Sequence, residues 1–522
     1  MRSSDRKRWG FAAAGAVSIA VLTACNVGPK YVKPAIPPPP AFKEAAPAAY
    51  SSAPPGAWQP ANPQDAVLKG KWWEMFNEPE LNALEEQLNI DNQNIAQYFQ
   101  NFMAARAQVR EARSAYFPTV TANPAITVSR TGSASQSAVV ATGGTSTGGT
   151  TGVSSSGGGS IFTDYSLPLE ASWAPDLFGR VRNTVREFQY AAQVSAADLE
   201  NERLTEQAAL AQYYFALRGQ DALQELYNRT IEVDRQALDL TRALFETGID
   251  NEESVAEAEV TLENAEEVGI GIATNRALYD HAIATLIGKA ASEFSMPVKK
   301  LTTPVPAIPV GVPSELLQRR PDIAATERTM AQANALIGVE KAAYYPALSL
   351  TGSGGLQSSA ISKLFSIPAL FWSLGASAAE TIFDAGLRNA TVAQYTATYN
   401  ADVASYKQTV LTAFQQVEDY IATLRVVSEQ IAKQDAAIRS AQRYVEIAMS
   451  RYETGLDPYL DVITAQNTLL SDQQTQVTLR VSEMTAAVQL IQALGGGWQV
   501  AQLPSVSEVT SKETPQKVSN TP

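Results

Sequence analysis

Few residues of this chain could carry out chemistry. Among 522 residues there is one histidine, His281, and one cysteine, Cys25. Cys25 lies far from any folded element that the pattern predicts, and His281 falls inside a helical stretch, so neither a Cys/His pair nor a Ser-His-Asp triad is indicated. No HExxH, P-loop or paired-cysteine metal spacing occurs, and the glycine runs at 143–159 lack a following Lys-Ser/Thr. We therefore expect neither an enzyme nor a bound cofactor or metal.

The single cysteine instead closes a secretory signal. A basic start is followed by an apolar stretch at 11–22, which is too short to span a bilayer. Leu22-Thr23-Ala24-Cys25 resembles a bacterial lipobox, which implies that residues 1–24 are removed and that Cys25 is acylated. By the same resemblance, Asn26 permits sorting to the outer membrane, where an aspartate would favour retention. The alternative is an ordinary signal peptide with an accidental cysteine.

Two long stretches dominate the rest of the chain. Residues 180–247 and 387–454 contain no proline and only one glycine, Gly219. Each is long enough for an unbroken helix of roughly 100 Å. Apolar residues of the second stretch recur at the spacing of a coiled-coil seam, interrupted by polar Ser428 and Asp435; they are Phe414, Val417, Ile421, Leu424, Ile431 and Ile438. Helices of this length must pack lengthwise against partners.

The two stretches are copies of one another. The same interval of 69 residues separates Gly179 from Gly248 and Gly386 from Gly455. Upstream, AYFP at 115–118 matches AYYP at 343–346. The first copy carries a Ser/Gly/Thr-rich insertion within 132–160. The chain is therefore an internal duplication.

Each copy also contains two candidate strands. Residues 161–173 alternate between apolar and polar, and 119–130 form a weaker partner. In the second copy the corresponding runs are 370–378 and 348–354. Each run is about long enough to cross a membrane when tilted, but four strands cannot close a barrel. No apolar run of eighteen residues follows Cys25. Strands in a membrane would thus require several chains, two or three, to share one barrel; a soluble hairpin with one buried face is the alternative.

Glycines and capping residues mark the turns. Gly248 and Gly455 suit the left-handed position that ends a helix. Asp250, with Glu253, and Asp457, with Pro458 following it, are expected to cap return helices that end near Gly288 and Gly495. A further helix is expected from Pro79 to about Tyr116, where AYFP ends it.

The predicted fold class is mainly α, internally duplicated, with four β-strands per chain. The expected parts are a signal peptide at 1–24, a lipidated Pro-rich tether at 25–70, a first repeat at 71–295 (helix, two strands, long helix, return helix), a linker at 296–320, a second repeat at 321–495 and a disordered polar tail at 496–522.

Six motifs in order resemble the TolC-like outer-membrane efflux channels, in the lipoprotein subgroup typified by NodT and OprM. They extend over residues 25 to about 495 and are WWEMF with Pro79-Glu80-Leu81, DLFGRVR at 176–182, VPSELLQRRPDI at 312–323, ANALIGVEKAAYYPALSLTG at 333–352, FDAGLR at 383–388 and RYETGLDPYLDV at 451–462.

The resemblance implies a homotrimer whose twelve strands form one outer-membrane β-barrel and whose helices form a periplasmic α-barrel. It implies a passive conduit in a tripartite pump, with a periplasmic adaptor and an inner-membrane pump as partners, that carries drugs or other small molecules outward. The net charge of −13 argues against nucleic acid and fits an acidic, water-filled lumen. An acylated periplasmic coiled-coil scaffold without a pore is the alternative.

The same resemblance implies two sets of site residues. The first would contact the adaptor at the periplasmic tip, although these residues could serve only to shape the turns: Gly248, Ile249, Arg451, Tyr452, Gly455 and Leu456. The second set, Asp457 and Asp461, would form rings of like charge at the pore constriction of a trimer, unless Asp457 is only a helix cap. We expect the tunnel to rest closed and to open when the tip helices splay.

Overall fold

A computed structural model describes residues 26–44, 70–130, 161–309 and 313–511. Cys25 and the insertion at 132–160 lie outside the described residues. The chain divides into two compact units. The strand unit comprises Met1–Tyr31, Gln108–Glu187 and Asn334–Ala397, and the helix unit comprises Val32–Ala107, Phe188–Ala333 and Thr398–Pro522.

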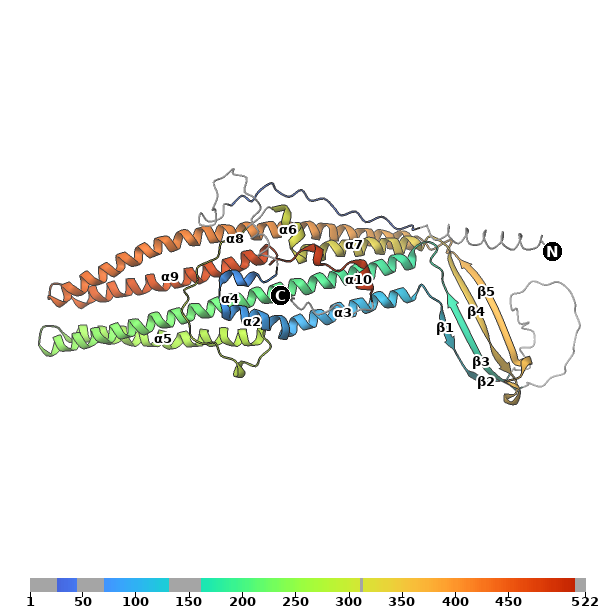
Figure 1. The fold of residues 1–522 in the computed structure, drawn as a ribbon, viewed down its shortest axis with the longest axis horizontal. Helices are drawn as coiled ribbons and strands as arrows, with labels where there is room; N and C mark the ends of the chain where they lie inside the picture. The colour runs from blue at the N-terminus through green and yellow to red at the C-terminus, as the bar shows by residue number, and fades with distance from the viewer. Residues whose placement is uncertain (1–25, 45–69, 131–160, 310–312, 512–522) are drawn as a thin grey trace, which may run out of the picture. The chain divides into compact units, whose positions relative to one another are not determined.

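Two very long helices and their return helices have the extents that the duplication predicts (Figure 1). Helices α4 (Arg180–Glu246) and α8 (Leu387–Glu453) each contain 67 residues. Helices α5 (Glu252–Leu286) and α9 (Tyr459–Ala493) follow them, with 35 residues each. Both ends of each of these four helices agree with the sequence prediction to within two residues, which is the usual uncertainty of helix ends.

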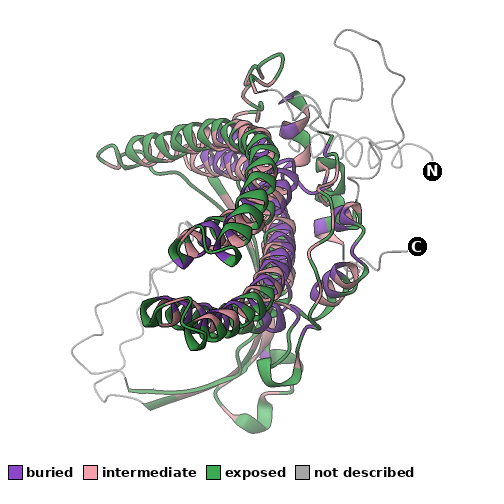
Figure 2. Ribbon diagram, turned by 90° about the vertical axis from the view of Figure 1, so that its left-hand side faces the viewer, coloured by how far each residue is buried: buried purple, intermediate pink, exposed green. Residues whose placement is uncertain are grey.

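Apolar residues on the facing sides of these helices form the core of the helix unit (Figure 2). On α8 the predicted seam is largely confirmed, since Val417, Ile421, Leu424 and Ile438 are buried. The polar seam residue Asp435 is satisfied from α9, where Gln476 donates a hydrogen bond to it and Arg480 lies 3.9 Å away. A polar residue in the seam thus fixes the register of one helix against the other.

The first helical region differs from the prediction of one helix from Pro79 to Tyr116. It consists of α2 (Pro79–Asp91) and α3 (Gln93–Ser114), separated at Asn92. Asn92 has an extended backbone, and its Oδ1 accepts a hydrogen bond from the N–H of Ile95 at 2.9 Å. Its Nδ2 donates to the carbonyl of Leu286, the last residue of α5, at 2.9 Å. One asparagine therefore caps a new helix and ties it to the end of α5.

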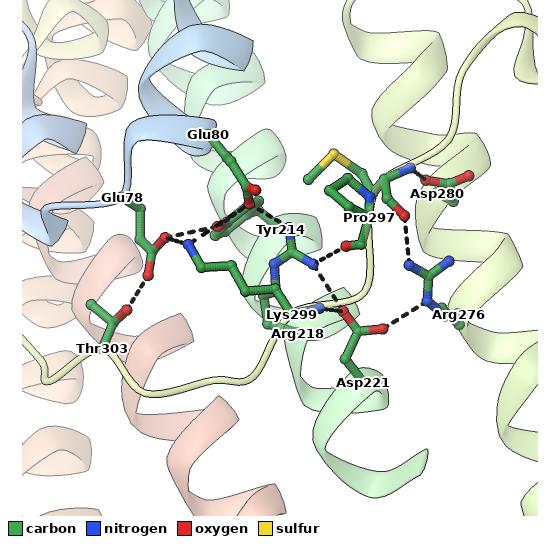
Figure 3. Close-up of polar contacts among 11 residues, drawn as sticks. Glu78, Glu80, Tyr214, Arg218, Asp221, Arg276, Asp280, Pro297, Lys299 and Thr303 are labelled. Atoms are coloured by element: carbon green, nitrogen blue, oxygen red, sulfur yellow. Dashed lines mark hydrogen bonds and ion pairs between the residues drawn. The ribbon is translucent and has the colours of Figure 1, made fainter. Parts of the chain in front are cut away.

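The linker before helix α6 (Pro313–Arg319) has no helix between residues 294 and 309. A network of ion pairs and hydrogen bonds nevertheless fixes it to the helix unit (Figure 3). At its centre is Arg218 of α4, whose side chain is only 2% exposed. It bonds Asp221 at 2.8 Å, Glu80 at 2.6 Å and the carbonyl of Pro297 at 2.6 Å.

Further members extend this network along the linker. Arg276 of α5 donates to Asp221 and to the carbonyl of Met296, both at 2.7 Å. Lys299 pairs with Glu78 at 2.6 Å, and Thr303 also donates to Glu78. Burial raises the pKa of Glu78, but its bonds from Lys299, Thr303 and Tyr214 outweigh burial and leave that pKa below its usual value. The network binds the linker to α2, α4 and α5 together.

Two other segments of the helix unit are more ordered than their composition indicates. In the tether, the backbone N–H groups of Lys43 and Glu44 donate to Glu418 of α8 at 2.7 and 2.9 Å. The polar segment after Gly495, for which the sequence indicates disorder, contains helix α10 (Val506–Thr510). Arg106 of α3 donates to the carbonyl of Ser511, next to α10, at 2.9 Å. Long-range polar contacts hold both segments together with apolar packing of Phe42 in the first and Trp498 in the second.

The strand unit contains one antiparallel sheet in the order β1-β3-β4-β5, with β2 also paired to β3. Strand β3 (Ile161–Trp173) has the predicted bounds, and its partner is interrupted into β1 (Thr119–Ala122) and β2 (Ala125–Arg130). In the second copy, β4 (Ala347–Ser358) and β5 (Leu370–Ala379) form the predicted hairpin. Helix α7 (Pro321–Ala342) precedes β4.

No residue of these five strands is buried within the chain, so neither face of the sheet is a core face. Large apolar side chains are left uncovered, including Trp372 at 75% and Leu374 at 81% exposure. None of the helices in the described ranges combines the length and the apolar character needed to cross a membrane.

Candidate tip site

The predicted tip residues lie in two similar turns of the helix unit, one between α4 and α5 and one between α8 and α9. Gly248 and Gly455 have the left-handed φ values of 75° and 71°. In the first turn the N–H of Ile249 donates to the carbonyl of Leu244 at 2.9 Å, and in the second that of Leu456 donates to Arg451 at 2.9 Å. These bonds reach back five residues and close the ends of α4 and α8.

The caps of the return helices differ from the prediction. Asn251, not Asp250, caps α5 and accepts from the N–H of Ser254 at 3.0 Å. Glu253 completes no capping box there. Asp457 does not cap α9, because Pro458 occupies the N-cap position. Both aspartates are engaged elsewhere, each with a residue from the end of α8.

A hydrogen bond from Tyr452 joins the two hairpins. Its hydroxyl donates to Oδ2 of Asp250 at 2.7 Å and lies 3.4 Å from the Thr241 hydroxyl. Tyr452 is 6% exposed, and its ring lies 5.2 Å from that of Tyr459 on α9. We call the Tyr452–Asp250 hydrogen bond the interhairpin link. It connects residues that are 202 positions apart in the chain.

An apolar cluster from all four helices surrounds this link. Its buried members come from α4, α5, α8 and α9: Ala237, Leu238, Ala258, Leu262, Ala448, Tyr452, Tyr459, Val462 and Ala465. The small alanines allow the helices to approach closely, and the two tyrosines fill the remaining space. The link is thus a polar contact inside a packed cluster, where breaking it would leave a half-buried carboxylate with one donor fewer.

The environment shifts the pKa of three groups at the tip. Burial raises the pKa of Asp250, but hydrogen bonds from Tyr452, Asn251 and Ser254 together outweigh it and hold that pKa below its usual value. Burial raises the pKa of Tyr452 to about 12. Burial also raises the pKa of Asp234, a carboxylate of α4 only 3% exposed, to about 6. Asp250 is therefore a stable anion, whereas Asp234 titrates near neutral pH.

The two predicted constriction residues lie close to a single cation. Asp457 forms a paired contact with the Arg451 guanidinium, at 2.5 and 2.8 Å, which lowers the pKa of Asp457. Asp461 lies in the first turn of α9, and its negative charge helps to stabilise the charged form of Arg451. One chain thus brings Arg451, Asp457 and Asp461 together. The charge ring requires symmetric copies and stays a prediction.

The outer surface of both turns is apolar. Ile249 is 70% exposed, Leu456 71%, Leu460 54% and Phe245 45%. Sequence analysis missed the roles of Asp250 and Thr241 as neighbours of Tyr452, and it missed Asp234. The one available signal for Asp234 was a short acidic side chain within the otherwise periodic α4.

Comparisons with known proteins identify the family. The family described as outer membrane efflux protein matches residues 84–289 and 312–496, one segment in each repeat. A probable efflux pump outer membrane protein, TtgC of Pseudomonas putida, is 30% identical over 504 residues, which are 96% of this chain and 98% of that protein. The Escherichia coli cation efflux system protein CusC is 25% identical over 92% of this chain and 97% of its own length.

Solved structures agree with this result. The outer-membrane channel OprN is 27% identical and superposes with a TM-score of 0.78, covering 91% of this chain and all of that chain. The Neisseria gonorrhoeae MtrE outer membrane channel, solved in its open state, has the same fold with a TM-score of 0.75 at 24% identity, over 91% of this chain and 99% of its own. From the two-segment match, the near full-length relatives and the duplicated long-helix fold, this chain belongs to the outer membrane efflux protein family.

Proposed function

We propose that this protein is the outer-membrane channel of a tripartite efflux pump, a passive trimeric conduit that is gated at its tip. It receives drugs or other small molecules from an inner-membrane pump and a periplasmic adaptor and releases them outside the cell. The observation that carries the gating proposal is the interhairpin link. In a family of channels, a hydrogen bond between two hairpins at the turn end of long helices is a contact that must break for the hairpins to separate.

The sheet supports a trimer. Strands β1 and β2 pair successively with β3, so they occupy one position and the chain contributes four strand positions. Within the described residues both outer strands have a free edge, and an unpaired edge is not tolerated in lipid. Three chains would pair all edges in a closed barrel of twelve positions, with the exposed Trp372 and Leu374 available to face lipid or lumen. A scaffold without a pore offers no cover for this sheet.

The tip surface supports an adaptor contact. Exposed apolar side chains cluster at both turns, with Ile249 in the first and Leu456 in the second. Such side chains at a turn end are unusual unless a partner covers them. Gly248, Gly455, Arg451 and Tyr452 shape the turns that present them. We propose that the adaptor binds these turns and that binding draws the hairpins apart.

The signal and lipobox support lipid anchoring at Cys25 in the outer membrane. Acyl chains and a barrel together would anchor the protein firmly, since a single chain binds a membrane only weakly. Asp457 and Asp461 are proposed to line the constriction. In a trimer they would place six carboxylates near the axis, with Arg451 of each chain beside them, and so favour cations.

Channel recording tests the proposed function. Full-length protein extracted from outer membranes is inserted in planar bilayers, and its conductance is measured with and without divalent cations. We expect discrete channels that divalent cations block, and weaker block in Asp461→Ala. A monomer that inserts without conductance would support the scaffold alternative. Unchanged conductance and block in Asp461→Ala would refute the constriction role alone.

A further inference from the structure

The first described residues of the chain lie in a pocket of the strand unit. Oδ1 of Asn26 accepts a hydrogen bond from Nδ2 of Asn183, on the first turn of α4, at 2.9 Å. The N–H of Val27 donates to the carbonyl of Phe178 at 3.4 Å. On the other side, Nδ2 of Asn334, on α7, donates to the carbonyl of Pro29 at 3.1 Å. Residues 26, 27 and 29 are therefore held by α4, by the residue Phe178 that precedes it and by α7.

The pocket is built by a buried amide. Asn183 is only 3% exposed, and both ends of its side-chain amide are used. Its Nδ2 donates to Asn26, and its Oδ1 accepts from Arg186 at 3.4 Å. The buried position and fixed orientation of this amide mean that Asn26 binds a pre-formed donor rather than a mobile surface group.

Three glycines from three segments make the close approach possible. A Cβ on Gly179, whose φ is +84°, would lie 2.6 Å from Oδ1 of Asn26. A Cβ on Gly338 would lie 2.6 Å from Nδ2 of Asn183, and one on Gly28 would lie 2.9 Å from the same atom. Atoms of these kinds do not approach so closely, so any larger residue at these positions would displace the segment.

The second repeat lacks this arrangement, so the fold itself does not require the arrangement. Gly386 occupies the place of Gly179 and has a similar φ of +88°, yet a Cβ there would meet nothing within 4 Å. Four residues after each glycine, the second repeat has Ala390 where the first has Asn183. The turn before a long helix therefore needs the glycine, but it does not need the asparagine. Asn183 is explained by the segment it binds.

We propose that Gly179, Asn183, Asn334 and Gly338 form a docking pocket for the first residues of the mature chain. The pocket recognises Asn26 and fixes the point from which the preceding residue leaves the protein body. It lies close in sequence to the end of β3, at the edge of the sheet where strands and helices join. This inference rests on the proposed acylation of Cys25: because Cys25 is bonded to Asn26, docking of Asn26 would keep the anchor within one residue of the strand unit.

Asn26 then has two separable roles. As the residue after Cys25 it would act in sorting before the protein folds, and in the folded chain it is the acceptor of the Asn183 bond. Asn26→Asp keeps an acceptor oxygen, so docking should persist even if sorting changes. Asn26→Ala removes the acceptor, so docking should weaken while sorting is unaffected.

Hydrogen exchange on the full-length protein tests the pocket. In detergent, the amides of residues 27, 28, 30 and 31 should exchange roughly fivefold faster in Asn183→Ala, Gly338→Ala and Asn26→Ala than in the unmodified protein, because a net hydrogen bond contributes about 1 kcal/mol. Asn26→Asp should keep the slow exchange. Gly386→Ala is the control, since it changes a glycine before the corresponding long helix of the second repeat where a Cβ meets nothing within 4 Å, and it should leave these amides unchanged.

Equal exchange in the unmodified protein and in Asn26→Ala would overturn the pocket. This variant keeps the test valid even if Asn183→Ala or Gly338→Ala fails to fold, since Asn26 is exposed and outside the core. Intact mass measures acylation of Cys25 separately. Slow exchange in a protein without acyl chains would support the pocket and refute only the proposed anchor.

Discussion

Removing one hydroxyl from Tyr452 should open the tip. In Tyr452→Phe the ring keeps its place beside Tyr459, while the 2.7 Å bond to Asp250 is lost. A hydrogen bond to a charged acceptor contributes about 1.5–3 kcal/mol. Because Asp250 is half-buried, the lower value applies. If the closed state contains one link in each of three chains, the combined loss is about 4.5 kcal/mol, which shifts the balance between closed and open states by roughly a thousandfold.

Single-channel recording in planar bilayers measures this shift as the open fraction. Tyr459→Phe is the matched control, since it removes a hydroxyl from the same cluster without breaking the link. The pKa of Asp250 lies below its usual value, so its contribution is present above about pH 4 and is lost as pH falls further. Unmodified channels should therefore open below about pH 4. Equal open fractions in the two phenylalanine variants at pH 7 would refute a gating role for the link.

Three further changes have calculable effects on stability. Asp234 has a pKa of about 6 in the folded protein, above its value in the unfolded chain. The free energy of unfolding should therefore fall as pH rises from about 4 to 6. Asp234→Asn should remove this pH dependence and stabilise the protein by up to about 3 kcal/mol at pH 7. Arg218→Met takes one of two guanidinium groups from the buried Asp221 carboxylate, which keeps Arg276, and should destabilise by about 1.5–3 kcal/mol. Arg229→Met, at a pair 4.0 Å apart with the arginine 70% exposed, should cost less than about 1 kcal/mol. Gly219→Leu should destabilise by about 1–3 kcal/mol, because Val481 of α9 packs directly on this glycine, and Val481→Ala should partly rescue it.

Thermal melting of the detergent-solubilised protein, followed by circular dichroism, measures all three. A slope between pH 4 and 6 that persists in Asp234→Asn would assign it to another group. Similar melting temperatures for the two arginine variants would mean that the Arg218 network contributes little. Failure of Val481→Ala to rescue Gly219→Leu would place the strain at another neighbour.

Local and periodic features of the sequence predicted most of the elements. Two stretches without proline, each closed by a glycine, predicted α4 and α8, and the alternation of residues 161–173 predicted β3 to the residue. The break at Asn92 escaped prediction because a polar residue inside an apolar-periodic run is indistinguishable from one on an exposed helix face. Its capping role depends on the end of α5, about 190 residues later.

The sequence predicted where the candidate site lies but not which residues its side chains contact. The motif RYETGLDPYLDV located Tyr452, but no pattern in one repeat indicates an acceptor in the other. Asp250 had a sufficient local explanation as a cap, and this explanation proved wrong because Asn251 caps α5, while Oδ2 of Asp250 accepts from Tyr452. Pairings between the two repeats depend on how the helices pack, which a single sequence does not specify.

The linker network has a practical consequence for anyone dividing this duplicated chain. The linker resembles a natural cut site between repeats, yet the carbonyl of Pro297 accepts a hydrogen bond from Arg218, and Lys299 forms an ion pair with Glu78. A cut before Pro297 would therefore remove Lys299 from Glu78 and leave the first half with charges that have lost a partner. A cut after Thr303 would instead leave all members of the network on the first half.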